Sequence, residues 1–233
     1  MQLENKTASI MQPTFIPWIG YFNMISKSDF FVFLDDVQMA KRSWQTRNRI
    51  KSNGEPLFLS LKISKANGSR NNINESYLIE DRSFIDKFLK TLELNYKKAK
   101  FYEKNRDFVN DILTNKQQTL AKYNSHIIQN IAERLEIETK FLFSSELQST
   151  GSKDEYLSNI CQEIGCDKYL SALGSKDYIE EGHNYFSDKN IQVEYNHYEH
   201  PTYNQVGKTF LPYMSIIDAI FNIDFEQTRE IIK

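Results

Sequence analysis

Residues 7–34 read TASIMQPTFIPWIGYFNMISKSDFFVFL and contain the pattern that decides the fold. A short apolar run at 7–11 is followed by a segment with helical character and then by the almost wholly apolar run 30–34. Near-continuous apolar runs of this length are typical of parallel strands that are covered on both faces. Because proline suits the first turn of a helix, the helix is expected to begin at Thr14 or Pro17. The stretch therefore predicts a strand–helix–strand unit of a parallel sheet.

The rest of the chain continues this alternation. Apolar residues recur at helical spacing between residues 83 and 136, which predicts a block of three helices that is either an insertion or a lid. Further strands are expected at 57–63, 141–143, 169–171 and 192–198, with helices after Lys153 and from Ser215. This order predicts an α/β fold over residues 1–233 as a single domain, with a Rossmann-like, mostly parallel sheet flanked by helices.

Composition and charge narrow the class of protein. Hydrophobic residues make up 40% and charged residues 26% of the 233 residues, which is typical of a globular chain. The formal net charge of −2 argues against general nucleic-acid binding. The apolar runs are far shorter than the ~18 residues of a membrane span, so we expect a cytoplasmic protein with no membrane span. The two cysteines, Cys161 and Cys166, are expected to be reduced thiols in a protein without a metal site.

The ends of the first two strands supply the first candidate site residues. In an open parallel sheet, ligands bind beyond the carboxyl ends of the strands. Gln12 follows the first strand, and Gly20 would let a ligand ring or phosphate approach the backbone closely. The alternative is that Trp18 only packs the helix on the sheet. Asp35 and Asp36 end the second strand, where they would act as a base, hold a sugar hydroxyl or cap a turn.

The basic stretch 38–51, QMAKRSWQTRNRIK, is the second candidate. Guanidinium groups such as those of Arg47 and Arg49 bind phosphate or carboxylate through two parallel hydrogen bonds. A basic loop beside the strand ends would suit a substrate that carries a diphosphate. Stacking of Trp44 on an RNA base and a simple solvated charged face are the alternatives.

The segment 197–205, HYEHPTYNQ, is the third candidate. His197 and His200 can each act as an acid or a base near neutral pH, although a lone histidine is often only a hydrogen-bonded structural group. No third ligand accompanies this pair, so a metal is not expected. The sequence also lacks the G-x-S-x-G, G-x-x-x-x-G-K-[ST] and G-x-G-x-x-G motifs of common hydrolases, kinases and NAD-dependent enzymes.

These same segments resemble a known family. Residues 12–22 (QPTFIPWIGYF), 31–38 (FVFLDDVQ) and 44–50 (WQTRNRI) are similar to the WbqC-like family, and so are the blocks around 169–178 and 200–222. The middle block contains Ser171, Gly174 and Tyr178. The resemblance covers nearly the whole chain, and it implies a role in the biosynthesis of bacterial O-antigen, lipopolysaccharide or another surface polysaccharide.

A second resemblance concerns the fold. Residues 17–21, PWIGY, stand where HxGH nucleotidylyltransferases carry their motif after the first strand. Trp18 and Tyr21 replace the two histidines, which stabilise the charge of the transferring phosphate in those enzymes. The resemblance therefore implies a distantly similar fold in which adenylyl transfer has been lost.

Two hypotheses follow. In the first, the protein is a transferase that moves an acyl or aminoacyl group to the amine of a nucleotide-linked sugar, with His200, Asp35 and Asp36 as catalytic residues. The cofactors are unknown, and a CoA or carrier-protein donor and a homodimer are left open. In the second, it is a non-catalytic module that binds a nucleotide sugar or a carrier protein. The residues expected to contact the substrate are Gln12, Pro17, Trp18, Gly20, Tyr21, Gln38, Lys41, Trp44, Arg47, Asn48, Arg49, Ser171, Gly174, Tyr203 and Gln205.

Overall fold

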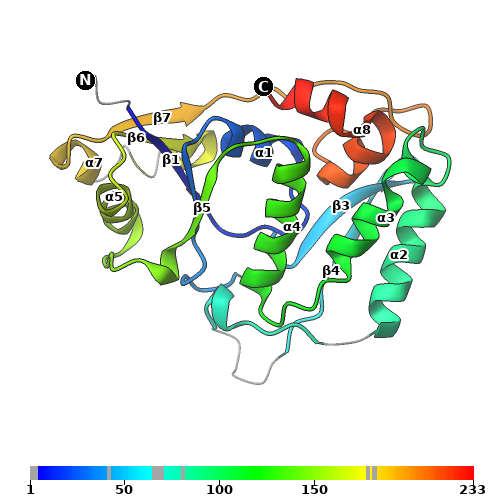
Figure 1. Ribbon diagram of the computed structural model, residues 1–233, viewed down its shortest axis with the longest axis horizontal. Helices are drawn as coiled ribbons and strands as arrows, with labels where there is room; N and C mark the ends of the chain where they lie inside the picture. Colours follow the sequence, from blue (N-terminus) through cyan, green and yellow to red (C-terminus); the bar gives the residue numbers. More distant parts are fainter. Residues whose placement is uncertain (1–4, 41–42, 65–70, 80–81, 177–178, 180–182) are drawn as a thin grey trace.

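The main element is a five-stranded parallel sheet with the strand order β5-β2-β1-β6-β7 (Figure 1). It is seen in a computed structural model that describes residues 5–40, 43–64, 71–79, 82–176, 179 and 183–233. The strands are β1 (Thr7–Met11), β2 (Phe30–Phe33), β5 (Lys140–Phe143), β6 (Lys168–Ala172) and β7 (Gln192–Asn196). The chain moves outward from β1 to β5 and then returns to the other side of β1, which is the doubly wound, Rossmann-like order that the sequence predicts.

Helices cover both faces of this sheet. The α-helices are α1 (Ile19–Ser26), α2 (Arg82–Tyr96), α3 (Tyr102–Leu113), α4 (Leu120–Arg134), α5 (Lys153–Glu163), α7 (Tyr185–Asp188) and α8 (Ile216–Ile232). The 3₁₀ helices are η1 (Ile73–Glu75), η2 (Ser144–Glu146) and η3 (Leu173–Ser175). Helices α2, α3 and α4 confirm the three helices predicted between residues 83 and 136. In the described part of the chain, no helix combines the length and the apolar character that a membrane crossing requires.

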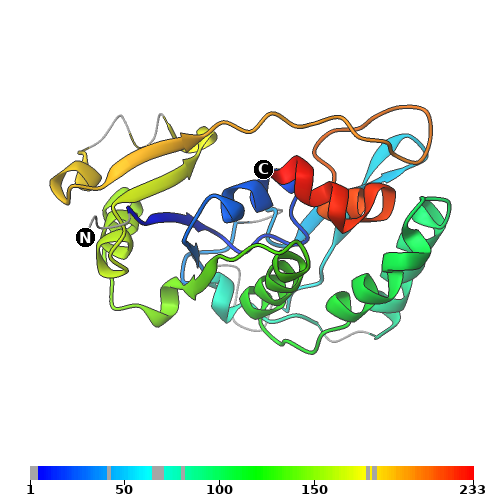
Figure 2. The same cartoon turned by 45° about the horizontal axis from the view of Figure 1, so that its top comes forward.

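Two hydrophobic clusters lie on opposite faces of the sheet because side chains alternate along each strand. Phe31 and Phe33 of β2 belong to the larger cluster, which also contains residues of α1, α2, α3, α4 and α8. Val32 of β2 and Ile10 of β1 belong to a second cluster with residues of α5 and α7. Figures 1 and 2 show α5 and α7 at one end of the molecule and α2 and α3 at the other. The helical block therefore shares its core with the sheet.

The first helix begins at Ile19, so the start expected at Thr14 or Pro17 is wrong. The reason is that the backbone before it bonds to distant segments. The N–H of Phe15 donates to the carbonyl of Trp44 at 2.9 Å, and the Pro17 carbonyl accepts from Ile216 at 2.8 Å. These hydrogen bonds hold residues 12–18 out of a helix, and the segment bends at residues 15–16, where Ile16 has a φ of 37°.

The basic stretch is not simply a loop, which corrects a second expectation. Arg47–Ser52 forms β3 and pairs antiparallel with β4 (Glu55–Ser60) in a separate two-stranded hairpin. The turn is Asn53–Gly54, with φ angles of 51° and 86°, which suits a two-residue hairpin connection. Because side chains alternate along a strand, Arg47, Arg49 and Lys51 share one face of β3.

Gly20 lies directly against the indole ring of Trp18, the residue that precedes α1. A Cβ atom added at Gly20 would be 2.1 Å from Cη2 of Trp18. We expected this glycine to let a ligand approach the backbone, but the ring that uses the space belongs to the protein itself. The glycine is needed because any side chain would push Trp18 away from α1.

The replacement of Gly20 by alanine is therefore expected to destabilise the protein by about 1–3 kcal/mol through the collision with Trp18. The measurement is urea unfolding of Gly20→Ala in the wild-type and Trp18→Ala backgrounds. The cost should fall to a few tenths of a kcal/mol when the indole is absent, as in a double-mutant cycle. An equal loss in both backgrounds would contradict this account of the glycine.

Candidate functional site

Six aromatic rings gather where the extended segment after β7 meets the start of α1. This aromatic cluster consists of Trp18, Tyr198, His200, Tyr203, Phe210 and Tyr213. The rings of Trp18 and His200 are stacked, with centroids 5.7 Å apart and planes 10° apart. Tyr213 places its edge against both rings, at 5.2 and 5.1 Å, and is 48% exposed. The cluster thus combines stacked and edge-on ring contacts and reaches the surface at Tyr213.

A hydrogen bond to the backbone fixes the tautomer of His200. Its Nδ1 lies 2.8 Å from the Pro201 carbonyl oxygen, so Nδ1 carries the proton and donates it. The other ring nitrogen, Nε2, is buried and has no hydrogen-bond partner among the described residues. Burial lowers the pKa of His200 below its ordinary value of 6.5. A neutral imidazole whose Nε2 lone pair has no partner has the protonation state of a base near pH 7, and a substrate would have to displace a covering ring to reach it.

Arg49 places a cation beside the aromatic cluster. Its Nη2 donates to the carbonyl oxygen of Tyr213 at 3.1 Å, and its guanidinium carbon lies 5.3 Å from the centre of the Trp44 ring. Its Nε is buried and has no partner in the part of the chain that the structure describes. Arg47 lies over the ring of Phe58, at 4.6 Å. Since Trp44 and Phe58 are 47% and 44% exposed, this face of the hairpin offers cations and aromatic rings to a ligand.

Asp218 of α8 is a site residue that sequence reasoning missed. It is completely buried, and its Oδ1 accepts from the hydroxyl of Tyr96 at 2.8 Å. Its Oδ2 accepts from the Tyr203 hydroxyl and from Nε2 of Gln205, both at 2.8 Å. Burial raises the pKa of Asp218, while these hydrogen bonds favour its charged form. The sequence feature that could have identified Asp218 is an acidic residue within the apolar run IIDAIF at 216–221.

The amide of Gln205 closes the loop that carries Phe210. Its Nε2 donates to the carbonyl of Leu211 at 2.9 Å, and its Oε1 accepts from the Leu211 N–H at 2.9 Å. Tyr203 and Gln205, which were both expected to bind substrate, therefore join the loop 205–211 to Asp218. Their hydrogen bonds to Asp218 and Leu211 hold the segment that carries His200 and Phe210 in place.

The acidic pair at the end of β2 lies in a different network. Asp35 is 1% exposed and accepts from the backbone N–H and the hydroxyl of Ser145, at 3.0 and 2.9 Å. Asp36 accepts from Ser144 Oγ at 2.6 Å and from the Tyr156 hydroxyl at 2.5 Å. These contacts agree with the turn-capping alternative. Within the described residues, no hydrogen bond joins either carboxylate to Arg49 or His200, so their catalytic role stays a prediction.

Several predicted substrate-binding residues are buried and hold the segment 12–18 in place. Pro17 and Tyr21 are buried, and the Tyr21 hydroxyl donates to the Gln12 carbonyl at 3.0 Å. Asn48 is also buried, and its Nδ2 donates to the carbonyls of Phe15 and Ile16 at 2.9 and 3.0 Å. The Gln12 side chain accepts from that of Gln45. These residues therefore support the segment 12–18, and their hydrogen bonds are to the protein itself.

The remaining predicted residues are spread along the strand ends. Gln38 is exposed and forms an isolated bridge with Asn72. Ser171 is buried at the end of β6, and Gly174 is exposed in η3, where a Cβ atom would meet nothing within 4 Å. Lys41 and Tyr178 lie outside the described residues. The structure thus brings together Trp18, Trp44, Arg47, Arg49, His200, Tyr203 and Gln205.

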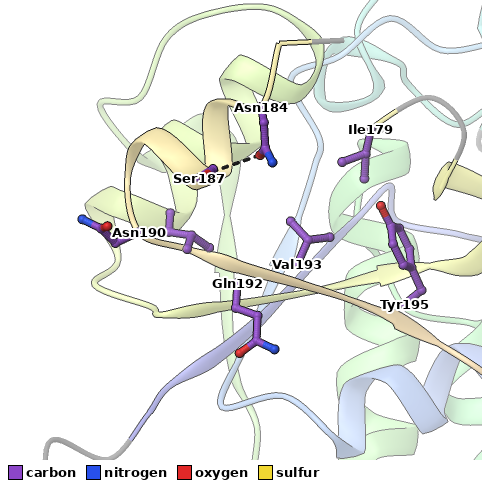
Figure 3. Close-up of a pocket in the computed structure, with 8 residues that line it drawn as sticks. Ile179, Asn184, Ser187, Asn190, Gln192, Val193 and Tyr195 are labelled. Atoms are coloured by element: carbon purple, nitrogen blue, oxygen red, sulfur yellow. Dashed lines mark hydrogen bonds between the residues drawn. The ribbon is translucent and has the colours of Figure 1, made fainter. Parts of the chain in front are cut away.

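A cavity lies away from this cluster, beside β7 and α7 (Figure 3). It has a volume of about 650 Å³, and Figure 3 shows Val193 and Tyr195 on one face of β7 with Gln192 on the other. The described residues that line it are uncharged and include none of the predicted site residues. Across the described ranges, no three His, Cys, Asp or Glu side chains come together as a group that could hold a metal ion.

The geometry defines an α/β protein with a doubly wound sheet and a site of stacked rings, a neutral histidine and arginines. The model of the WbqC-like protein family matches residues 12–230, which include every residue of this site. A protein of Mycobacterium tuberculosis (strain ATCC 25618 / H37Rv), named "Uncharacterized protein Rv1507c", is 30% identical over 223 residues, which are 95% of each chain. No solved structure matches the chain. The chain belongs to the WbqC-like protein family, as its sequence blocks predict.

Removal of the Asp218 carboxylate should strongly destabilise the protein. Asp218→Ala leaves the hydroxyls of Tyr96 and Tyr203 and the amide of Gln205 without their buried acceptor, which is expected to cost about 3–5 kcal/mol. Urea unfolding measures this loss, with Asp107→Ala as the control because the Asp107 side chain is 85% exposed on α3. Equal stabilities of the two variants would show that the network is not needed for the fold.

Proposed function

We propose that the protein binds a nucleotide-linked amino sugar at the aromatic cluster and the adjoining arginine face, and transfers an acyl or aminoacyl group to the sugar amine. The observation that carries the proposal is a pair of buried nitrogens, Arg49 Nε and His200 Nε2, that adjoin Tyr213 and have no partner among the residues described. Arg49 Nε carries a proton that it can donate to an anion. His200 Nε2 has a lone pair that can accept a proton from an amine or a hydroxyl.

The hairpin face supplies the anchor for the nucleotide. Arg47 and Arg49 are next-but-one neighbours on β3 and can hold the two phosphates of a diphosphate. The half-exposed rings of Trp44 and Phe58, whose centroids are 6.1 Å apart, offer a stacking surface for the base. This arrangement would direct the sugar toward the aromatic cluster.

The reaction needs a base and correct orientation more than a protein nucleophile. The sugar amine attacks the acyl carbon, a C–N bond forms, and the bond from that carbon to the leaving group of the donor breaks. In this proposal the substrate displaces Tyr213, the most exposed ring beside His200, and so reaches the buried Nε2. Nε2 then accepts the amine proton and returns it to the leaving group. Cys161 and Cys166 are both buried, so neither presents an accessible thiol for an acyl-enzyme. Asp36, the less buried of the acidic pair, is assigned to a sugar hydroxyl.

The surface-polysaccharide role in this proposal comes from membership of the WbqC-like family, together with arginines and aromatic rings that would suit a sugar nucleotide. A CoA thioester or a carrier-protein thioester would supply the acyl group in the same way, since both release a thiol. The proposal therefore specifies the acyl acceptor, a sugar amine, more closely than it specifies the acyl donor.

The second candidate is a non-catalytic module that binds a nucleotide sugar or carrier protein. This alternative is favoured by Trp18 and Tyr21, which occupy the two positions where HxGH nucleotidylyltransferases carry histidine. An indole and a phenol carry no positive charge, so Trp18 and Tyr21 cannot offer a cation to a transferring phosphate. Tyr21 is buried and Trp18 is stacked on His200, so both side chains have packing roles instead. A protein that binds the sugar nucleotide but never converts it with any acyl donor would support this alternative.

Binding should be visible in the thermal stability of the protein. A UDP-linked amino sugar at ~100 times its dissociation constant should stabilise the protein by ~2.7 kcal/mol. Arg49→Gln should remove most of this effect, whereas Arg106→Gln on the exposed face of α3 should not. Stabilisation by ATP with an amino acid, without any effect of sugar nucleotides, would contradict the proposal and favour a ligase.

The transfer reaction should depend on the neutral form of His200. Because burial holds the pKa of His200 below 6.5, activity should be full at pH 7 and should fall only as the pH drops through that lowered value. His200→Ala should reduce kcat by about 10²–10⁴-fold and remove this acidic limb from the pH profile. His197→Ala is the control, since His197 is exposed. The catalytic assignment fails if His200→Ala and Asp36→Asn both leave activity unchanged.

A further inference from the structure

A second cavity lies beside the loop 205–211 and has no part in the function proposed above. It is enclosed by the turn of the β3–β4 hairpin, the C-terminal end of α2 and the segment 206–209, and has a volume of about 390 Å³. Figures 1 and 2 both show the segment after β7 passing α8 and reaching the tip of this hairpin and the end of α2. Its size falls within the range of about 300–1,000 Å³ that is usual for small-molecule sites.

The charge of this cavity is opposite to that of the whole chain. Lys51, Lys98 and Lys208 line it, and none of its described lining residues is acidic, although the net charge of the chain is −2. Three ammonium groups around one cavity repel each other, and an anion between them would relieve that repulsion. The carboxylate of Asp218 attracts Lys51 but is not part of the lining.

Hydrogen-bond donors of the kind that bind phosphate surround the same space. Lys51 is only 4% exposed and donates one Nζ proton to the Thr209 carbonyl, which leaves two protons for a ligand. The backbone N–H groups of Gly207, Lys208 and Thr209 donate to no other group within the described ranges. The amides of Asn53 and Asn95 complete the polar lining. Backbone N–H groups without a protein partner, next to lysines, are donors that proteins use to bind phosphate.

Gly207 fits this role through its backbone. Its φ of +92° is a conformation that other residues rarely adopt, and a Cβ added there would lie 3.7 Å from Lys51 Nζ. The glycine therefore allows the chain to turn beside the buried ammonium group and keeps the space next to it open.

We propose that this cavity binds a phosphate or diphosphate group, at a site separate from Arg47 and Arg49. The inference rests on the lysines, the backbone donors and the cavity, and does not depend on the transfer reaction. Lys208 and Thr209 bind the anion from the loop, Lys98 from the end of α2, and Lys51 from β3.

The test is isothermal titration of the full chain with inorganic pyrophosphate at low ionic strength. Lys98→Gln and Lys208→Gln should each weaken binding by about tenfold, the usual cost of a lost charge-assisted hydrogen bond. Both lysines are exposed, so these variants should fold. Lys97→Gln is the matched control, because Lys97 is exposed next to Lys98 and does not line the cavity.

Two results would overturn the inference. One is the absence of pyrophosphate binding by the wild type. The other is binding that survives Lys98→Gln and Lys208→Gln but is lost in Arg49→Gln, which would place the anion on the hairpin face and leave the proposed function standing. Displacement of bound pyrophosphate by ADP would support the site and assign its phosphate to a nucleotide. Lysine-dependent binding without such displacement would support it as a site for a smaller phosphate compound.

Discussion

The burial of Asp218 is the constraint on which the arrangement of the site depends. A carboxylate removed from water must be compensated by hydrogen bonds or by an opposite charge. Asp218 obtains three hydrogen bonds, from Tyr96 of α2 and from Tyr203 and Gln205 of the segment after β7. Because the donors come from separate parts of the chain, one buried charge fixes their relative positions. His200 lies only three residues before Tyr203, so its place in the aromatic cluster follows from the same network.

Backbone hydrogen bonds unite the N-terminal and C-terminal blocks of the family. The Pro17 carbonyl accepts from Ile216, and Trp18 forms a bridge with Ser215. The N–H of Ser215 also donates to the carbonyl of Arg49 at 2.8 Å. These contacts place the start of α8 between the start of α1 and the β3–β4 hairpin. Three blocks that are far apart in the sequence therefore form one surface.

Much of the fold could be predicted because its signals are local. The apolar run at 30–34 and the helical spacing between 83 and 136 indicate β2 and the block α2–α4 directly. The start of α1 could not be placed, since the backbone partners of residues 12–18 lie elsewhere in the chain. The strand expected at 57–63 overlaps β4, but its partner β3 was missed because charged residues occupy one face of β3. For the site, residue types pointed to Arg49 and His200, but the Ser145 and Tyr156 partners of the acidic pair cannot be read from local sequence.

The separation of the partners of Asp218 along the chain has a consequence for how the protein forms. Asp218 and Tyr96 are 122 residues apart. Contacts between distant residues form slowly, because closing a long loop costs entropy before the contact stabilises it. During synthesis the helical block and most of the parallel sheet leave the ribosome before α8 is made. Until α8 docks, the hydroxyls of Tyr96 and Tyr203 have no carboxylate to bind, so the site is assembled among the last parts of the molecule.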